Sequence, residues 1–372
     1  MSRVALAHDW LTGMRGGEKV LEVLCDRYPD ADILTLLHVP GSVSNRIERH
    51  PIQTSLVQHL PAAATRYRSY LPLFPLAVNR LDASPYDLLI STSHCAVKSI
   101  QVRPGARHLC YCFSPMRYAW DQFDAYFGPA KVGALKSRLI YEPIMRRMAR
   151  WDAATAGRVH RFVAISDHVA QRIRRYYNRD ATIVYPPVDT VFFHPADVPA
   201  GSHFLIVSAL VPYKRIDLAI AACTRLGARL RIVGDGPERE TLERAAGPNV
   251  EFLGWQTDEQ IRDEYRRALA VLLPGEEDFG IVPLEAQACG RPVVALGRGG
   301  ALETVVHGET GALSAPDGSV ASFAAALRDA QRMTFDGRRI RTHAERFSLD
   351  RFVREFEAVV DDTVAAPAGT TW

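Results

Sequence analysis

One stretch of sequence decides the fold: Pro274-Gly-Glu-Glu-Asp-Phe-Gly-Ile-Val-Pro-Leu-Glu285-Ala-Gln-Ala-Cys-Gly290. It follows the apolar run 269–273, which has the length and composition of a buried strand. Gly275 and Gly280 bracket a turn, Pro283 suits the first position of a helix, and Gly290 suits its end. The order of strand, glycine loop and helix is that of a Rossmann-like unit.

The start of this predicted helix is a candidate anion site. Free backbone amides near Gly280, Ile281 and Val282 would offer hydrogen bonds and a partial positive charge to a phosphate. We expect Glu285 in the first helical turn, where its carboxylate can accept from a ribose diol, and Glu277 on the loop, where it can hold a sugar hydroxyl. Two glutamates at this spacing also fit a solvated surface helix whose first-turn acid favours the dipole. The pattern predicts a pocket for a nucleotide sugar.

The sequence beyond Gly290 repeats the same order of elements. A second apolar run, 293–296, leads into the glycine pair Gly299-Gly300 and a short helical stretch. Strand-like runs alternate with helix-length segments along the whole chain, which predicts parallel sheets with crossover helices. The runs in the first half are 4–7, 33–37, 88–91, 108–112, 162–165 and 183–185; those in the second half are 204–208, 230–233, 250–253, 270–273 and 293–296.

A chain of 372 residues fits two domains. Proline and glycine mark a linker at 186–201, so we predict an N-terminal domain over 1–185 and a C-terminal, nucleotide-sugar-binding domain over 202–348. Charge is unevenly divided: residues 1–185 carry a net +10 and residues 186–372 a net −7. Six cysteines in this length indicate no disulfide framework, and no apolar run approaches a membrane span.

Other residues join the predicted site. Lys214 follows the strand at 204–208 and can neutralise a leaving diphosphate, with Arg215 beside it; a solvated turn lysine is the alternative. Gly16 and Gly17 open a helix after the first strand and allow close approach of a pyrophosphate, although they do not form a dinucleotide fingerprint. His94 ends a strand and can bind a sugar hydroxyl or orient an acceptor, or be an ordinary satisfied polar residue.

With these motifs in place, the chain resembles the retaining glycosyltransferases of family four. The glutamate pair matches that family's retaining motif over the segment 204–313. The first half resembles the branch that contains many bacterial GDP-mannose-dependent mannosyltransferases. The segments that carry this likeness are His8-Asp-Trp-Leu, Arg15-Gly-Gly-Glu-Lys, Ser91-Thr-Ser-His94, Ser114-Pro-Met-Arg-Tyr-Ala-Trp120-Asp and Tyr185-Pro-Pro-Val-Asp189.

The resemblance implies a GT-B fold, α/β, with two facing Rossmann-like domains and an interdomain cleft. It implies hexosyl transfer with retention, GDP-mannose as the preferred donor, and a C-terminal helix, 349–361, that packs back on the N-terminal domain. It adds Phe279 to the donor-binding set and places Trp255 near the nucleotide base, where plain packing is the alternative. No Asp-x-Asp metal site is evident in a suitable loop, so no divalent ion or other cofactor is expected to be required.

The acceptor side rests on the N-terminal domain. Asp9, Arg117, Tyr118 and Asp121 are the candidates, and Arg117 could contact an anionic acceptor such as a lipid pyrophosphate. We expect a saccharide or lipid-linked acceptor and a cytoplasmic protein. The basic N-terminal domain suits peripheral contact with the anionic inner membrane face, the alternative being a solvated helix face. Nucleic acid is not expected as a partner.

Two departures from the family pattern keep other functions open. Ala209 stands where relatives commonly carry an arginine, and Phe113 stands where they commonly carry a histidine. A UDP- or TDP-hexose donor is the nearest alternative, and a catalytically weak nucleotide-sugar-binding partner subunit is another. A nicotinamide oxidoreductase is disfavoured because the dinucleotide fingerprint is absent.

Overall fold

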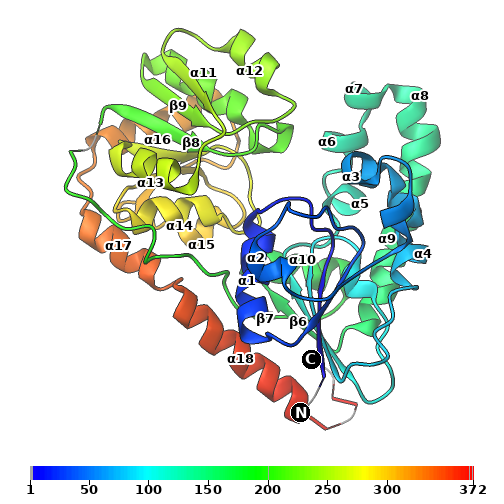
Figure 1. The fold of residues 1–372 in the computed structure, drawn as a ribbon. Coiled ribbons are helices and arrows are strands. Elements are labelled where there is room, and N and C mark those ends of the chain that lie inside the picture. Colours follow the sequence, from blue (N-terminus) through cyan, green and yellow to red (C-terminus); the bar gives the residue numbers. More distant parts are fainter. Residues whose placement is uncertain (1–2, 200, 368, 371) are drawn as a thin grey trace. The chain divides into compact units, whose positions relative to one another are not determined.

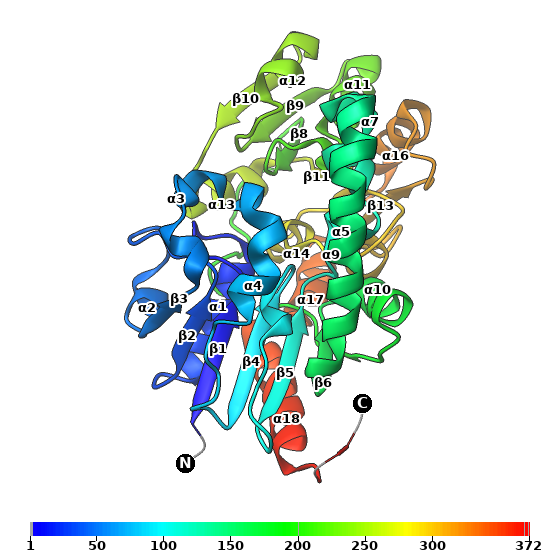
Figure 2. The same ribbon diagram turned by 90° about the vertical axis from the view of Figure 1, so that its right-hand side faces the viewer.

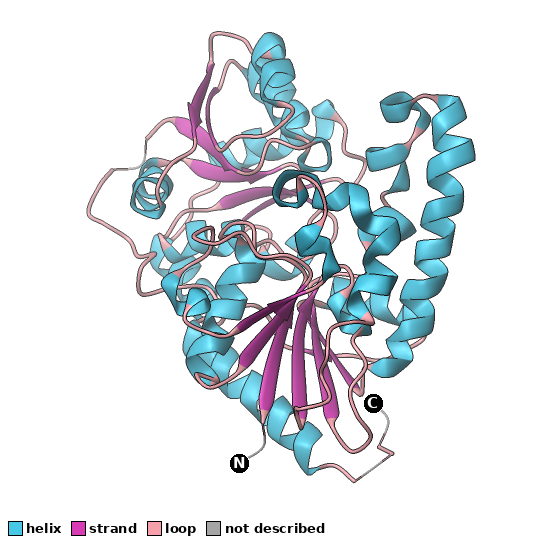
Figure 3. Ribbon diagram, turned by 45° about the vertical axis from the view of Figure 1, so that its right-hand side comes forward, coloured by secondary structure: helices cyan, strands magenta, loops and turns pink. Residues whose placement is uncertain are grey.

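The computed structural model describes residues 3–199, 201–367, 369–370 and 372. Within them the chain divides into two compact units (Figure 1). The first unit comprises Met1–Tyr185 and Arg354–Trp372, and the second comprises Pro186–Val353. Each unit is a parallel sheet with helices on its faces, as Figure 3 shows by colour.

The first unit is built on seven described strands in the order β3-β2-β1-β4-β5-β6-β7. They are β1 (Val4–His8), β2 (Asp32–Thr35), β3 (Ile52–Thr54), β4 (Leu88–Ser93), β5 (Arg107–Cys112), β6 (Arg161–Ala164) and β7 (Thr182–Ile183). All neighbours pair in parallel, with His8 opposite Thr92 where β1 meets β4. The chain steps outward from β1 to β3 and then returns to β4, so the strand order reverses between β1 and β4.

Helices and turns connect these strands (Figure 2). The helices are α1 (Gly16–Arg27), α2 (Asn45–Glu48), α3 (Ala63–Arg66), α4 (Phe74–Val78), α5 (Arg117–Trp120), α6 (Phe123–Phe127), α7 (Pro129–Val132), α8 (Ala134–Lys136), α9 (Glu142–Thr155) and α10 (Asp167–Tyr177). The tight turns are η1 (Leu56–His59), η2 (Tyr67–Leu73), η3 (Val97–Ser99) and η5 (Ala156–Arg158), and η4 (Ser137–Tyr141) is a π-helical turn.

The second unit has six described strands in the order β10-β9-β8-β11-β12-β13, all parallel. They are β8 (His203–Val207), β9 (Arg229–Val233), β10 (Val250–Gly254), β11 (Ala270–Leu273), β12 (Val293–Leu296) and β13 (Gly311–Ser314). The other elements are α11 (Ile216–Leu226), α12 (Arg239–Ala245), α13 (Asp258–Arg267), α14 (Ile281–Ala288), α15 (Ala301–Thr304), α16 (Val320–Arg332), α17 (Gly337–Glu345) and the turn η6 (Pro212–Lys214). Here the order reverses between β8 and β11.

Alternating strand residues build two cores in the second unit. Phe204 and Ile206 of β8 face a cluster that includes Phe323 of α16, whereas Leu205 faces a cluster that includes Tyr265 of α13. Side chains alternate across a strand, so both sheet faces must be covered by helices. This layering leaves the carboxyl ends of the strands as the edge where polar loops gather.

The final helix, α18 (Leu349–Ala365), extends four residues beyond the predicted end at 361. From Arg354 onward its residues belong to the first unit. The Phe356 ring packs edge-on against Tyr111 of β5 at 5.6 Å between centroids, and Arg161 of β6 pairs with Asp362. The C-terminal segment therefore supplies part of the core of the first unit.

Candidate active site

Two loops meet at the point of the second sheet where the strand order reverses. One follows β8 and carries Lys214, and the other follows β11 and carries Glu277. They approach so closely at Gly275 that a Cβ there would lie 2.6 Å from the Tyr213 carbonyl oxygen and 2.9 Å from the Lys214 Cα. In open α/β sheets ligands bind outside the carboxyl ends of strands at such a reversal. This edge is the candidate site of the second unit.

Lys214 and Glu277 form an ion pair across these loops. The Lys214 ammonium donates to Oε1 of Glu277, whose side chain is almost entirely buried, while the lysine stays partly exposed. The two residues lie 63 positions apart in the chain. The fold thus brings together two residues that the sequence predicted separately for one site.

The glycine pair Gly299-Gly300 braces the glutamate loop from the next strand. Gly299 has φ +59°, and the amide of Gly300 donates to the Glu277 carbonyl oxygen at 2.8 Å. A Cβ on Gly300 would lie 2.3 Å from the Phe279 Cα. Because no larger residue fits this contact, the pair fixes the backbone from which the Glu277 side chain extends.

Helix α14 begins two residues earlier than expected. Its first residue is Ile281, after Gly280 in the left-handed region at φ +91°, so the prediction that Pro283 occupies the first helical position is wrong. Glu285 is consequently the fifth helical residue, and the expectation that it lies in the first turn is also wrong. The amides of Ile281 and Val282 still belong to the first turn, where an α-helix leaves its donors unpaired within the helix.

Glu285 is buried and hydrogen-bonded within the unit. Its Oε2 accepts from the hydroxyl of Tyr265 on α13 at 2.9 Å. Burial and the nearby Glu285 charge together raise the pKa of Tyr265 well above its usual value, so the phenol keeps its proton to donate. This contact fixes the orientation of the carboxylate.

The remaining donor-side candidates lie in different settings. The Arg215 guanidinium pairs with Asp217 at 3.1 Å, and its backbone is left-handed at φ +51°. The Phe279 side chain is buried and packs against Phe347. Trp255, directly after β10, is 76% exposed. Of these, only Trp255 presents a large free surface to solvent.

In the first unit, Asp9 lies at the corresponding reversal, between β1 and β4. Its buried carboxylate accepts from four consecutive backbone amides: His94 and Cys95 at 2.7 and 2.9 Å, and Ala96 and Val97 at 2.6 and 2.9 Å. Burial alone would raise the pKa of Asp9, but interaction with His94 and hydrogen bonds from the amides of Ala96, Val97 and His94 hold the pKa below the usual value. Asp9 therefore organises the loop after β4.

His94 lies within a group of aromatic rings at this edge. Its ring is perpendicular to Trp10 at 4.5 Å between centroids, and it lies 6.4 Å from His8 and 6.5 Å from Phe113. Burial lowers the pKa of His94 despite the opposing charge of Asp9, which favours the neutral imidazole. A neutral imidazole can both donate to and accept from a hydroxyl.

Sequence reasoning missed a second histidine and a glutamate. His8 and Glu18 are both buried, with Nε2 of His8 3.7 Å from Oε1 of Glu18 and Nδ1 of His8 2.7 Å from the Thr92 hydroxyl. Nε2 of His8 has no hydrogen-bond partner within the described residues. Burial would raise the pKa of Glu18, but His8 lowers it below the usual value. The sequence feature that could have revealed them is a polar residue at the end of a buried strand, together with an acidic residue in the helix that begins with the glycine pair.

Gly16 and Gly17 form the first turn of α1. A Cβ on Gly17 would lie 3.3 Å from both His8 Cε1 and Phe113 Cε2, which is tight but leaves some room. The small residue lets the helix start approach these two rings. The predicted glycine loop thus lies in the same cluster as His8.

The other acceptor-side candidates are tied into the framework of the first unit. The Tyr118 hydroxyl lies 2.7 Å from Sγ of Cys95, and the Asp121 carboxylate pairs with Arg172 at 2.8 Å. Arg117 is partly exposed at the start of α5. Of these candidates, Arg117 is the cation. It precedes Tyr118, whose hydroxyl contacts Cys95 on the loop that carries His94.

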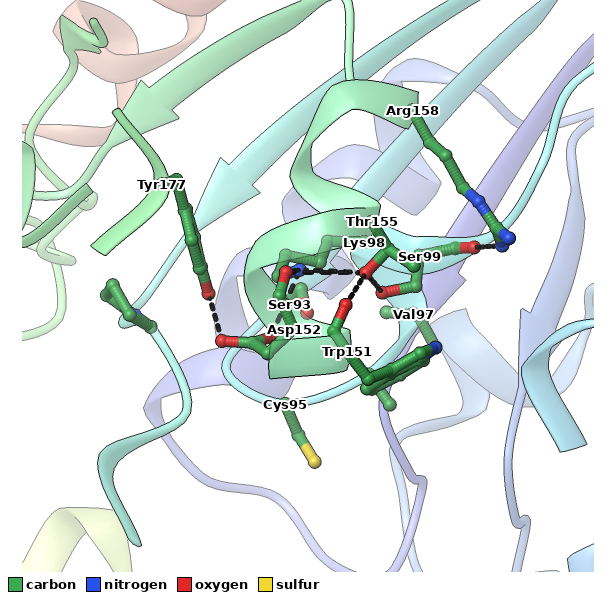
Figure 4. A network of polar contacts seen from close by, with 12 residues as sticks. Ser93, Cys95, Val97, Lys98, Ser99, Trp151, Asp152, Thr155, Arg158 and Tyr177 are labelled. Atoms are coloured by element: carbon green, nitrogen blue, oxygen red, sulfur yellow. Dashed lines mark hydrogen bonds and ion pairs between the residues drawn. The ribbon is translucent and has the colours of Figure 1, made fainter. Parts of the chain in front are cut away.

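A buried polar network supports the loop that carries His94 (Figure 4). The Lys98 ammonium, 2% exposed, lies 3.0 Å from the Asp152 carboxylate and donates to the Asp152 carbonyl oxygen at 2.7 Å. Asp152 also accepts from the Tyr177 hydroxyl and the Trp120 indole, both at 2.8 Å. A buried charge is tolerated only when paired and hydrogen-bonded, as here. The network fixes η3, which follows His94 in the chain, and α5, which begins with Arg117.

A metal-binding cluster and a membrane-spanning helix are both absent from the residues that the structure describes. No cluster of three or more His, Cys, Asp or Glu side chains that could hold a metal ion is found in that part of the chain. No helix among the same residues is both long and apolar enough to cross a membrane. All six cysteines are buried and free.

Comparisons with known proteins agree with the observed fold. Residues 199–346 match the family model described as "Glycosyl transferases group 1". The D-inositol 3-phosphate glycosyltransferase of Segniliparus rotundus is 31% identical over 256 residues, covering 60% of this chain and 55% of that protein. The enzyme of the same name from Salinispora tropica is 34% identical over 232 residues, covering 51% and 48%. The chain thus spans about half the length of these relatives.

Solved structures match almost the whole chain. HepE of Anabaena in complex with UDP has a TM-score of 0.71 at 18% identity, covering 97% of this chain and 100% of that one. The sucrose-phosphate synthase of Thermosynechococcus elongatus has a TM-score of 0.71 at 18% identity, covering 99% and 100%. With two parallel-sheet Rossmann-like units and these matches, the chain has the GT-B fold, and residues 199–346 of its second unit are similar to group 1 glycosyl transferases.

Proposed function

We propose that the protein transfers a hexosyl group, with retention, from a nucleotide diphosphate sugar to a hydroxyl of a saccharide or lipid-linked acceptor. The observation that carries this proposal is the Lys214–Glu277 pair at the β8/β11 reversal, beside the first turn of α14. A cation, a helix N-terminus and a carboxylate at one edge suit a diphosphate joined to a sugar.

The reaction breaks the bond between the anomeric carbon and the diphosphate oxygen, which leaves negative charge on the departing phosphate. Lys214 and the first-turn amides of α14 stabilise that charge, and such electrostatic stabilisation is the largest contribution in many enzymes. An ammonium has three donors, so Lys214 can keep its bond to Glu277 and bind a phosphate oxygen as well. The acceptor oxygen bonds to the anomeric carbon, and its proton passes to the departing phosphate oxygen.

The two glutamates hold different parts of the donor. Glu277, on a loop braced by Gly299-Gly300, accepts from hydroxyls of the transferred sugar. Glu285, oriented by Tyr265, accepts from the ribose diol. Arg215 is a weaker candidate for the diphosphate, because it would have to leave Asp217.

In the first unit, the cluster of His8, Glu18 and His94 binds sugar hydroxyls. Nε2 of His8, which makes no hydrogen bond within the described residues, and the buried Glu18 carboxylate are the groups that support this role. Phe113 occupies the position of the histidine in relatives, and His94 lies 6.5 Å from it. A neutral His94 beside Phe113 can take over the hydroxyl contact.

Two kinds of donor, which differ in nucleotide base and sugar, are the candidates. The resemblance to mannosyltransferases favours GDP-mannose, whereas HepE, a fold neighbour, binds UDP and UDP-glucose. A UDP- or TDP-hexose is therefore the alternative donor. We propose turnover without a divalent ion, which predicts equal rates with and without EDTA.

The second candidate function is a binding subunit with weak catalysis. Its support is that Ala209 contributes no cation and that Arg215, which could replace the missing arginine, pairs with Asp217. Such a protein would bind sugar nucleotides without turnover. Assays of donor hydrolysis and transfer separate it from the enzyme.

The test is a thermal-shift panel of GDP-, UDP-, TDP- and ADP-sugars without added metal, followed by transfer assays. A ligand that binds only the folded state raises the melting temperature by mass action. Lys214→Gln should lower kcat by roughly 100- to 1,000-fold, as for a lost transition-state donor. Glu277→Gln, which removes the charge of the carboxylate that accepts from the sugar hydroxyls, should chiefly slow transfer. Glu285→Gln should chiefly reduce the donor-induced shift.

Glu309→Gln is the matched control, because Glu309 is an exposed glutamate of the same unit. It should leave both the shift and the rate unchanged. A panel with no responding nucleotide, or site variants that turn over like Glu309→Gln, would remove the assignment.

A further inference from the structure

A helical hairpin of the first unit exposes large aliphatic side chains. Leu135 is 74% exposed, Leu139 63% and Ile140 50%. They lie at α8 and the π-helical turn η4, which follow α7 and lead into the long helix α9 (Figures 1 and 2). Three neighbouring aliphatic residues with this exposure are unusual, since a soluble surface normally scatters them singly.

Other side chains pack the inner face of the hairpin, so the exposed aliphatic residues are not needed for its packing. Tyr141 at the end of η4 stacks on Phe127 of α6, with centroids 4.8 Å apart and rings 13° from parallel. Met145 and Met148 of α9 are buried in the core of the unit. Leu135, Leu139 and Ile140 do not belong to this buried set and are exposed instead.

Exposed basic residues flank the aliphatic group in the sequence. Residues 129–151 contain one acidic residue, Glu142, which pairs with Arg146. The same stretch contains six basic residues, all exposed: Lys131, Lys136, Arg138, Arg146, Arg147 and Arg150. Aliphatic side chains flanked by lysine and arginine are the arrangement by which interfacial helices bind anionic lipid.

We propose that this hairpin docks on an anionic lipid surface, with Leu135, Leu139 and Ile140 entering the boundary between headgroups and acyl chains. Lys136 and Arg138 lie within three residues of them and would meet the lipid phosphates. The charge complementarity selects a membrane over a second copy of this chain, whose hairpin would bring equal positive charge. The proposal does not depend on glycosyl transfer, because vesicle binding is measured without donor or acceptor.

The test is sedimentation of the full chain with phosphatidylcholine vesicles, with and without phosphatidylglycerol. Wild type should bind only the anionic vesicles, and added salt should weaken binding by screening. The pair Lys136→Gln/Arg138→Gln should weaken binding by roughly 30-fold, since each charge near such a surface is worth about a factor of five. The triple variant Leu135→Ser/Leu139→Ser/Ile140→Ser should weaken it by roughly tenfold or more.

Matched controls come from the second unit. Val191→Ser removes an aliphatic side chain that is 87% exposed, and Arg328→Gln/Arg332→Gln removes two exposed charges. Both should bind vesicles like wild type, and all variants should keep the wild-type circular dichroism spectrum. Wild type that ignores anionic vesicles, or hairpin variants that bind like the controls, would overturn the proposal. A dimer that the triple variant abolishes, without vesicle binding, would reassign the hairpin to self-association.

Discussion

Histidines of the first unit show how position in the sheet, more than residue type, sets chemical role. His8 and His94 lie at the carboxyl ends of β1 and β4, where polar partners converge. His108 lies inside the sheet, fully buried, with Nε2 2.8 Å from the Ser91 hydroxyl. The first two can meet a ligand hydroxyl, whereas the third can only affect stability.

His108 should make the protein sensitive to acid. Burial, and then the charge of His160, lower the pKa of His108 to about 3, whereas an unfolded histidine titrates near about 6.5. Between these values the unfolded chain binds more protons, so stability is lost as pH falls from about 6.5, at up to about 1.4 kcal/mol per pH unit. His108→Gln removes this dependence. The advantage of wild type over the variant should shrink by about 2 kcal/mol between about pH 7 and about pH 5.

Urea unfolding followed by tryptophan fluorescence at both pH values measures this difference. His59→Gln, at an exposed histidine, is the control and should follow the wild-type pH dependence. Parallel pH dependence of wild type and His108→Gln would show that His108 is not the titrating group.

At the scale of elements, the candidate site depends on loops that touch through glycine. Gly275→Ala would place a methyl group 2.6 Å from the Tyr213 carbonyl oxygen, so the loop bearing Lys214 must shift away from Glu277. We expect a loss of about 1–3 kcal/mol, typical of overpacking, and a reduced donor-induced thermal shift. Gly157→Ala is the control, because no heavy atom lies within 4 Å of its Cβ position.

Thermal melts with and without sugar nucleotide distinguish the two glycine variants. Equal melting temperatures and equal nucleotide shifts for Gly275→Ala and Gly157→Ala would show that loop contact is not needed for the site.

Strands with continuous apolar character were predictable, and short edge strands were not. The runs that became β4 and β11 are buried on both faces and read directly as strands of a parallel sheet. The sequence analysis missed β3, which is three residues long and includes Gln53, and β13, which begins with Gly311. Such strands owe their conformation to pairing with a neighbour, a contact that local composition does not encode.

The site was predictable where a residue type is tied to a local turn, and not where a tertiary contact decides. Lys214 and Glu277 each followed a predicted strand, and parallel strands place such loops at one edge. The role of Asp9 could not be predicted from the sequence, because the four amides that it binds lie 85 to 88 residues away along the chain. The contact between His8 and Glu18 likewise depends on how α1 packs beside β1.

At the scale of the whole molecule, the chain leaves the first unit at Tyr185 and returns to it at Arg354. The returning residues of α18 contact β5 and β6 through Phe356 and Asp362, and Glu357 pairs with Arg27 of α1. The first unit is therefore completed by residues made last. Its fold should depend on the C-terminal segment although the second unit lies between them in sequence.

Phe356→Ala tests that dependence. Phe356 is buried against Tyr111, so truncation should cost about 3–5 kcal/mol, as for other buried aromatic residues. The loss should appear as faster amide hydrogen exchange in β5, which Phe356 contacts, and in β4, which pairs with β5. It should not appear in β8 and β11, which belong to the other unit. Val364→Ala, at an exposed position of the same helix, should leave exchange unchanged. If Phe356→Ala accelerated exchange equally in β5 and β11, the two units would unfold as one cooperative body, and the returning segment would stabilise the whole molecule instead of one unit.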